Sequence, residues 1–498
     1  MPTSRIGVAQ VEITPDWVGP TSGWGIALFG GTAKAAPPSD PAERLYVTAV
    51  ALSDSGGDVL VLANIDIHSG SRPVWEGAAK FAGIEPRQLV LCGTHTHGGP
   101  GQPYGGFVYS LGSTSPLGLG RMRRHLIERV GRAVKRAIAN LSPGGVDIKR
   151  GDVHDVGNNR ATPAWKHYSD DDVDGFLTDG PGRSLAHCER KAEKYRDPRM
   201  TVLVATSDDG EQHGLLGWYG VHPNATGPKW KTYTADLYGW ARTRVLSDQP
   251  DALVGFGAGP VGDISPLALG DDGHMLPPHS SGADMQGSDL ASAHGERLGE
   301  AMLNIAAGAA PAEFTLTSSY RDWRPTESLP SPYYGMTQFA GGIDGPAGDW
   351  AALEAGAESE RAESLAHRQF SMIGGQGPKI PWLYSVVRFP VPTGWFFRLA
   401  MPKSLPLHAV RIGNHLFVTV PGEPTTMTGW RIEKAVLEAT DVTTASVMGC
   451  TGDYCGYWVT PEEYLEQRYE AASTAFGREA SVELEKQLAS LGAEAEAS

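Results

Sequence analysis

Short apolar runs separated by turn residues fill much of the chain. The run at 59–67 (VLVLANIDI) is apolar at nearly every position, which is typical of a strand buried on both faces. Residues 410–420 (VRIGNHLFVTV) predict a hairpin that turns at Gly413-Asn414. The other runs of strand length are 6–13, 45–52, 88–92, 200–205, 215–221, 253–256 and 444–448.

Helical spacing is clearest over residues 122–141, where apolar side chains recur every three or four positions from Met122 to Leu141. The opposite face of this helix is rich in Arg and Lys. We interpret it as a solvated face, with a docking face for an acidic partner as the alternative. Further helices are predicted at 349–370, at 426–438 and from about 479.

Strands that alternate with helices predict an α/β fold. We expect one large catalytic domain over residues 1–478, with a mixed β-sheet flanked by helices, and a short acidic tail over 479–498. Long polar loops at 98–118, 151–190 and 267–290 are expected to form pocket walls, because loops of that length in a compact domain are usually functional or disordered.

Composition narrows the classes of function. The chain has 42 Lys and Arg against 57 Asp and Glu, a net charge of −15, which argues against non-specific binding to nucleic acid or anionic membranes. With 41% hydrophobic residues it can fill a core, which excludes intrinsic disorder. Its 4 cysteines form no CxxC pair, so a disulfide scaffold is not expected.

Apolar runs and the first residues also bear on the expected location of the protein. No run of about 18 apolar residues predicts a membrane-spanning helix, so stable membrane insertion is not expected. The first residues lack the basic and apolar regions of a signal peptide, which predicts a cytoplasmic protein, or a secreted one if a leader was trimmed. The oligomeric state is left open.

The strongest chemical signal is Thr94-His95-Thr96-His97, directly after an apolar strand and before two glycines. Residues two apart on an extended backbone share a face, so His95 and His97 can converge on a metal or a substrate. Two surface histidines in a loop are the alternative.

His222 and Glu423 also follow apolar strands. A single histidine there is more often structural, and Glu423 is either a helix-start acid or an anionic metal ligand. Ser265 and Asp263 lie in a Gly-flanked turn (GDISP), where the serine is a nucleophile, a substrate hydrogen-bonder or a turn residue. The GxSxG elbow is missing, and the GxGxxG at 257–262 precedes an irregular loop, so neither an α/β-hydrolase nor a dinucleotide site is predicted.

Together these segments resemble the neutral/alkaline (non-lysosomal) ceramidase family. The shared motifs, in the same order, are HTHGGPG, GVHPN, GDISP, VPGEPTTMTGWR and DYCGYWVTPEEYLEQRYEAASTAFG, with ITP, IDIHSG and Asn159-Arg160 before or between them. The resemblance covers residues 5–477 and implies a zinc amidase.

Carried over motif by motif, the family's zinc ligands fall on His95, His222, Glu423 and Tyr457, with Tyr454 as the competing tyrosine. Imidazole, carboxylate and phenolate ligands suit Zn²⁺. The family's substrate and catalytic positions fall on His97, Arg160, Ser265 and Tyr469, and we expect Asp263 and Tyr454 beside the substrate.

The resemblance implies that a zinc-bound hydroxide attacks an amide carbonyl, giving a carboxylic acid and an amine. His97 or Tyr469 would help zinc to stabilise the oxyanion, and His97 is a candidate proton donor to the amine. Ser265 is the alternative nucleophile.

Three departures bear on the substrate: HTHGGPG replaces HTHSGPG, Leu267 follows GDISP, and the sequence ends before the family's C-terminal immunoglobulin-like domain. We therefore expect a small-molecule or lipid-like acyl amide as substrate, ceramide among the candidates. The alternatives are hydrolysis of another amide, an ester or a carbamate, and an inactive binding homologue.

Overall fold

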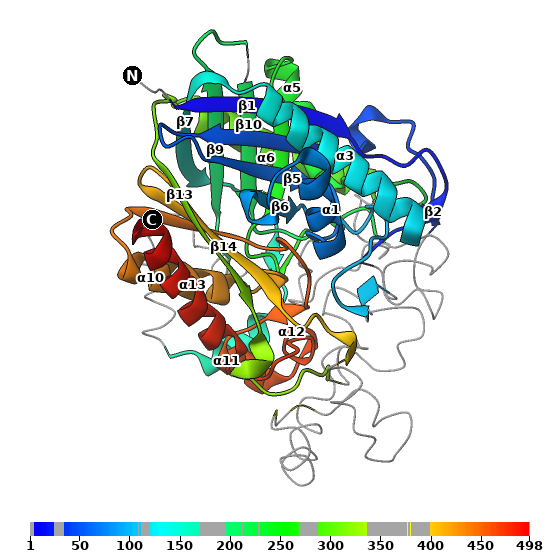
Figure 1. The fold of residues 1–498 in the computed structure, drawn as a ribbon. Helices are drawn as coiled ribbons and strands as arrows, with labels where there is room; N and C mark the ends of the chain where they lie inside the picture. The colour runs from blue at the N-terminus through cyan, green and yellow to red at the C-terminus, as the bar shows by residue number, and fades with distance from the viewer. Residues whose placement is uncertain are drawn as a thin grey trace.

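The computed structural model describes residues 4–23, 34–107, 109–110, 119–169, 196–211, 213–227, 230–267, 287–335, 376, 379 and 399–497. Two β-sheets pack against each other in this part of the chain, and helices cover the outer face of each sheet (Figure 1).

The larger sheet has eight strands in the order β11-β10-β9-β7-β1-β4-β5-β6. The pairs β5/β6 and β10/β11 are parallel and the other neighbours are antiparallel, so the sheet is mixed. Its strands are β1 (Arg5–Glu12), β4 (Tyr46–Ser53), β5 (Val59–Ile65), β6 (Leu89–Gly93), β7 (Ser142–Asp152), β9 (Arg199–Ser207), β10 (His213–Tyr219) and β11 (Leu253–Ala258).

Both faces of this sheet are buried, and the two-residue period of a strand divides its side chains between them. In β1, Val8 packs toward the second sheet, whereas Val11 belongs to the core beneath helices on the outer face. The outer helices are α1 (Arg72–Ala82), α3 (Leu119–Ala139), α5 (Leu237–Asp248) and α6 (Ser288–Ala306).

The second sheet has the order β13-β14-β15-β17, with β15 and β17 parallel. Phe417 of β15 packs against Trp218 of β10 with ring centroids 4.9 Å apart, so the two sheets share one apolar layer. The strands are β13 (Leu316–Trp323), β14 (Leu405–Ile412), β15 (His415–Thr419) and β17 (Thr444–Met448), and α10 (Thr426–Ala439) and α13 (Ala480–Ala497) cover their outer face.

Short elements complete the described chain and frame the site. They are β2 (Gly19–Pro20), β3 (Lys34–Ala35), β8 (Asn158–Asn159), β12 (Ile264–Ser265), β16 (Glu423–Pro424), β18 (Tyr457–Trp458), α11 (Pro461–Glu466), α12 (Tyr469–Ala472) and the 3-10 turns Pro41–Glu43, Pro86–Gln88, Thr162–His167 and Pro325–Glu327.

The predicted mixed α/β fold is confirmed, as are the helix at 122–141 and the hairpin at 410–420. The hairpin turns where Gly413 adopts a φ of 57°, a conformation that favours glycine. A second sheet facing the first was not predicted. The helix predicted at 349–370 lies outside the described residues, and so do large parts of the three predicted pocket-wall loops.

The segment 479–498, expected as a short acidic tail and predicted to be helical from about residue 479, forms α13 almost throughout. Leu484, Leu488 and Leu491 of this helix are fully buried in the core of the second sheet. The boundary at residue 478 remains a prediction. In the described chain, no helix is both long enough and apolar enough to cross a bilayer.

Candidate metal centre

Three predicted ligands meet where strands of both sheets end. His95 follows β6, His222 follows β10, and Glu423 lies in β16 just after β15. A backbone hydrogen bond joins the ends of the two sheets here. The N–H of Gly93, at the end of β6, donates to the carbonyl of Cys450, which follows β17, at 3.1 Å. The imidazoles therefore lie just beyond strands of the larger sheet, and the carboxylate lies in the short strand β16 that follows β15 of the second sheet.

The ligand atoms converge closely. The Nε2 atoms of His95 and His222 lie 3.3 Å and 3.0 Å from Oε2 of Glu423. One ligand atom from each residue falls within 4.8 Å of the others, and all three side chains are buried.

The opposite ring nitrogens fix how each imidazole is oriented. Nδ1 of His95 lies 2.8 Å from the His68 carbonyl, and Nδ1 of His222 lies 3.1 Å from the Ile264 carbonyl. A carbonyl only accepts, so each Nδ1 carries a hydrogen, and in the neutral imidazole each Nε2 then presents a lone pair. Imidazole ligands of metals are commonly held by such outer hydrogen bonds.

Two imidazole lone pairs and a carboxylate oxygen thus face one another in a buried space. Such a set of acceptors repels itself unless a proton or a cation lies among them. Two imidazoles and a carboxylate are also a ligand combination that divalent metals use in proteins. The residues therefore fit a cation.

The charges agree with this geometry. Burial, with a contribution from the charge of Arg160, lowers the pKa of His222 to about 4. His222 is consequently neutral at neutral pH, in keeping with an Nε2 atom that presents a lone pair.

Two tyrosines flank the carboxylate. The Tyr454 hydroxyl donates to Oε1 of Glu423 at 2.5 Å. Tyr457 pairs with Glu423 in the β16/β18 register, and its hydroxyl accepts from Nη2 of Arg160 at 2.9 Å. Burial raises the pKa of both phenols well above the usual value. Both candidate tyrosines therefore lie next to the same ligand.

Arg160 is buried and held on several sides. Its Nε donates to Glu470 at 2.9 Å and its Nη2 to the Gly262 carbonyl at 3.0 Å. Its guanidinium lies 5.6 Å from the ring centroid of Tyr469, which is 5.4 Å from the ring of Tyr457. The arginine thus connects Tyr457 with Tyr469.

His97 stands beside the metal cluster. Its ring centroid lies 5.2 Å from that of His95 and 5.8 Å from that of His222, and burial lowers its pKa well below the usual value. Among the predicted site residues, only His97 and Tyr469 are half-buried, and the others are buried. A substrate that reaches the cluster would meet these two side chains.

Ser265 and Asp263 lie deeper. The Ser265 hydroxyl accepts from the Leu267 N–H at 3.3 Å, and in the described ranges no histidine or carboxylate hydrogen-bonds to it. Asp263 accepts from the N–H and hydroxyl of Thr426 with one oxygen and from Asn159 with the other. Burial raises the pKa of Asp263 to about 6. These contacts fasten β12 to β8 and to the start of α10.

Sequence reasoning missed His68 as part of the site. Its carbonyl accepts from His95, its ring centroid lies 4.3 Å from that of His95, and its Nδ1 is 2.8 Å from the Tyr104 hydroxyl. The available signal was a histidine just beyond the buried run at 59–67, the same placement as His95. Without a neighbouring HxH pattern, that signal is weak.

Backbone strain marks the same place. His95 has a φ of 70° and Cys450 a φ of 49°, values that favour glycine. The Cys450 sulfur lies 3.2 Å from Nδ1 of His95. Strained non-glycine residues persist where surrounding structure fixes them and are frequent at functional sites.

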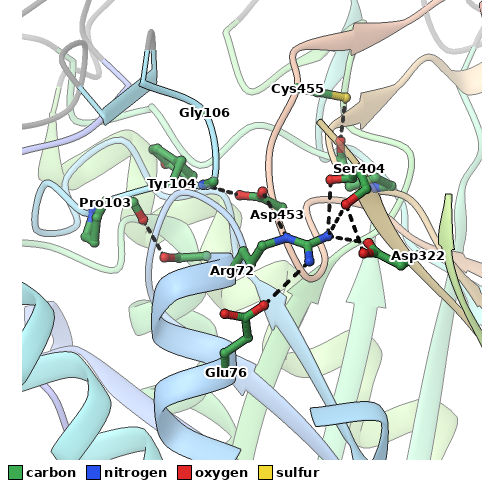
Figure 2. A network of polar contacts seen from close by, with 12 residues as sticks. Arg72, Glu76, Pro103, Tyr104, Gly106, Asp322, Ser404, Asp453 and Cys455 are labelled. Carbon is green, nitrogen blue, oxygen red and sulfur yellow. Dashed lines mark hydrogen bonds and ion pairs between the residues drawn. The ribbon is translucent and has the colours of Figure 1, made fainter. Parts of the chain in front are cut away.

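A polar network braces the segment that carries Tyr454 (Figure 2). Arg72 at the start of α1 donates to Asp322 at 2.6 Å and to the Ser404 carbonyl at 3.1 Å, and lies 3.9 Å from Asp453. Asp453 also accepts from the Gly105 N–H at 3.0 Å. The network therefore ties α1, the second sheet and the loop at Tyr104 to the residue before Tyr454.

Known proteins are similar to this chain in sequence. The family model described as neutral/alkaline non-lysosomal ceramidase, N-terminal, matches residues 5–291 and 312–484. The chain is 26% identical over 419 residues to the neutral ceramidase of Mycobacterium tuberculosis, covering 79% of this chain and 61% of that protein. It is 24% identical over 444 residues to the neutral ceramidase of Pseudomonas aeruginosa, covering 80% of this chain and 58% of that protein.

Solved structures agree with the fold. A structure titled as a ceramidase complexed with C2 superposes with a TM-score of 0.74 at 22% identity, covering 99% of this chain and 75% of that chain. The crystal structure of the P. aeruginosa neutral ceramidase gives 0.73 at 21% identity, with 99% and 74% covered. At these identities the likeness establishes the fold. The chain spans about 60% of the length of the curated relatives above.

Proposed function

Because the chain belongs to the neutral/alkaline non-lysosomal ceramidase family, we propose that it is a zinc-dependent hydrolase of ceramide or of a related N-acylated amine. The products are a carboxylic acid and an amine. The observation that carries the proposal is the convergence of His95 Nε2, His222 Nε2 and Glu423 Oε2 on one buried point.

His95, His222 and Glu423 would hold the zinc ion, and Tyr457 would be the fourth ligand. Its place opposite Glu423 in the β16/β18 register supports this choice, while the Tyr454 hydroxyl at 2.5 Å from Glu423 keeps Tyr454 as the alternative. When bound, zinc polarises an amide carbonyl and brings the pKa of a water toward about 7.

Proton transfer and oxyanion stabilisation would be carried out by side chains next to the proposed zinc site. His97 stands close to both histidine ligands and is half-buried, so it is placed to pass a proton to the departing amine. Tyr469 is the other half-buried group and is placed to donate its hydroxyl hydrogen to the developing oxyanion. Arg160 holds Tyr457 by a hydrogen bond and lies over Tyr469.

We keep Arg160, Asp263 and Tyr454 as proposed substrate-side residues, and Ser265 as the proposed alternative nucleophile. The protein contacts of Asp263 support an indirect contribution, in which it positions β12 and the start of α10. Attack by Ser265 requires that its hydroxyl leave the Leu267 N–H and find a base.

The test is release of amine from a panel of N-acylated amines, ceramide among them, with esters and carbamates beside them. Wild-type protein should cleave at least one amide, lose that activity to a zinc chelator and regain it with added zinc. His222→Ala should be inactive. His213→Ala is the matched control, because His213 lies at the far end of β10 and contacts Thr206 and Gln249.

Other results would separate the alternatives. Cleavage that persists in chelator, and in His222→Ala, would reject the zinc mechanism and move the chemistry to Ser265. Cleavage of esters or carbamates but of no amide would keep the metal and reject the amide substrate.

A further inference from the structure

A second group of imidazoles adjoins the proposed zinc ligands. His68, His95 and His97 each offer a ring nitrogen within 4.8 Å of those of the other two. Their ring centroids are separated by 4.3 Å for His68 and His95, 5.5 Å for His68 and His97, and 5.2 Å for His95 and His97. His95 therefore belongs to both groups, while His68 and His97 belong only to this one.

The ring nitrogens can be assigned from their partners. Nδ1 of His95 is engaged by the His68 carbonyl, so its Nε2 serves the cluster with His222 and Glu423. Nδ1 of His68 lies 2.8 Å from the Tyr104 hydroxyl, and when Nδ1 donates to that oxygen, Nε2 of His68 presents the lone pair that binds a metal. The single lone pair of His95 Nε2 binds only one ion, the one held with His222 and Glu423. A second ion beside it would therefore depend on His68 and His97 for its imidazole ligands.

An oxygen ligand also lies between the two positions. The ring centroid of Tyr454 is 4.8 Å from that of His68, and its hydroxyl reaches Oε1 of Glu423 at 2.5 Å. The phenol thus touches the carboxylate of the first position and packs on the imidazole of the second. Ions that share a site in two-metal hydrolases are about 3.5–4 Å apart, a spacing compatible with adjoining clusters.

We infer that His68 and His97 form a second cation subsite, adjacent to the first and bounded by Tyr454. Imidazole ligands favour a borderline divalent ion such as Zn²⁺ or Co²⁺ over Mg²⁺ or Ca²⁺. The second subsite has fewer protein ligands and no carboxylate of its own, so it fills after the first and binds more weakly. While a cation occupies this subsite, His97 cannot serve as the proposed proton donor, so the inference concerns metal occupancy and does not rest on the proposed reaction.

The chain offers a clean way to remove this subsite alone. The His68 carbonyl holds His95, and a side-chain substitution leaves that carbonyl in place. His68→Asn removes the imidazole and keeps a polar partner for Tyr104, while His68→Phe keeps a ring of similar size. Tyr104→Phe retains both imidazoles and deletes only the hydrogen bond that orients His68.

The experiment titrates metal-free protein with Zn²⁺ and with Co²⁺, by calorimetry and by cobalt absorption, and measures the equivalents bound per chain. Wild-type protein should bind two equivalents, the second at least about 10-fold more weakly. His68→Asn and His68→Phe should each bind one, with the first affinity unchanged. Tyr104→Phe should bind two, the second weakened about 10-fold, as is usual for lost outer-shell support. His213→Ala should match wild type.

A single equivalent in wild-type protein at every metal concentration overturns the inference. Two equivalents in both His68 variants also overturn it, and loss of the first equivalent in them would make His68 part of the first site instead. Two His68-dependent equivalents in a protein that cleaves no amide would reject the proposed function and support the subsite. One equivalent with zinc-dependent cleavage would support the proposed function and reject the subsite.

Discussion

The substitution Glu423→Gln tests whether the cluster of His95, His222 and Glu423 is a metal centre or an ordinary buried hydrogen-bond cluster. In the metal-free wild type, Oε2 of Glu423 faces the Nε2 lone pairs of His95 and His222 at 3.3 Å and 3.0 Å. No hydrogen lies among these atoms when the histidines donate through Nδ1. A glutamine amide would supply an N–H to one of the imidazoles, so the metal-free variant should gain stability while its metal affinity falls.

The magnitudes follow from general values. A buried acceptor without a donor costs about 1–3 kcal/mol. For a chain of 498 residues, an unfolding entropy of about 2 cal/mol/K per residue makes 1 kcal/mol equivalent to roughly 1 °C in Tm. Metal-free Glu423→Gln should therefore melt about 1–3 °C above metal-free wild type. Metal at about 1,000 times Kd adds about 4 kcal/mol, hence about 4 °C, to wild type alone.

The assay is scanning calorimetry of both proteins with and without zinc, with His213→Gln as the matched control. The control should melt like wild type and gain the same increment with zinc. The reasoning is refuted if metal-free Glu423→Gln melts several degrees below wild type, because the carboxylate would then be satisfied without metal. An equal zinc increment in the variant would show that Glu423 is not a ligand.

Three further predictions follow from the packing around the site. Burial raises the pKa of Glu463 to about 8, above its ordinary value of 4.5. The protonated carboxyl therefore stabilises the folded state fully below about pH 4.5, and this stabilisation is lost as pH rises through about 8. Tm should fall over this window, and it should fall less in Glu463→Gln. Phe417→Ala should destabilise the sheet interface by about 3–5 kcal/mol in denaturant unfolding, and a loss under about 1 kcal/mol would contradict the packing. Gly262→Ala should weaken zinc binding about 10-fold, because a Cβ there would lie 2.9 Å from the Glu423 carbonyl oxygen; unchanged affinity would show that the backbone yields.

Local patterns predicted local structure well. The run at 444–448 and the helix at 122–141 lie close to the observed β17 and α3, and the Gly413-Asn414 turn is where β14 meets β15. These features depend on periodicity and turn chemistry, which act between near neighbours in the chain. Features that depend on contacts between distant segments were not predicted from such local patterns.

The second sheet illustrates that limit. β14 and β15 are apolar on both faces, since one face meets the larger sheet and the other meets α10 and α13. A run that is apolar throughout does not say which element covers either face. The same holds for the segment after 478, where an acidic composition concealed the buried leucines of α13.

The candidate site was likewise predicted only in part from the sequence. His95, His222 and Glu423 were selected by a motif resemblance and come together in the structure, although about 330 residues separate the first from the last. His68 was passed over because its carbonyl and ring contacts arise only from the folded turn after β5. The order of strands, which brings these ends together, is not encoded in any one segment.

The central claim is that the cluster of His95, His222 and Glu423 binds the metal that supports amide hydrolysis. The most direct test measures zinc per chain and amine release in the same samples as a chelator removes the metal stepwise. The account predicts that activity falls to zero together with the last tightly bound equivalent and returns when zinc is restored. Full activity in protein stripped of metal would contradict it.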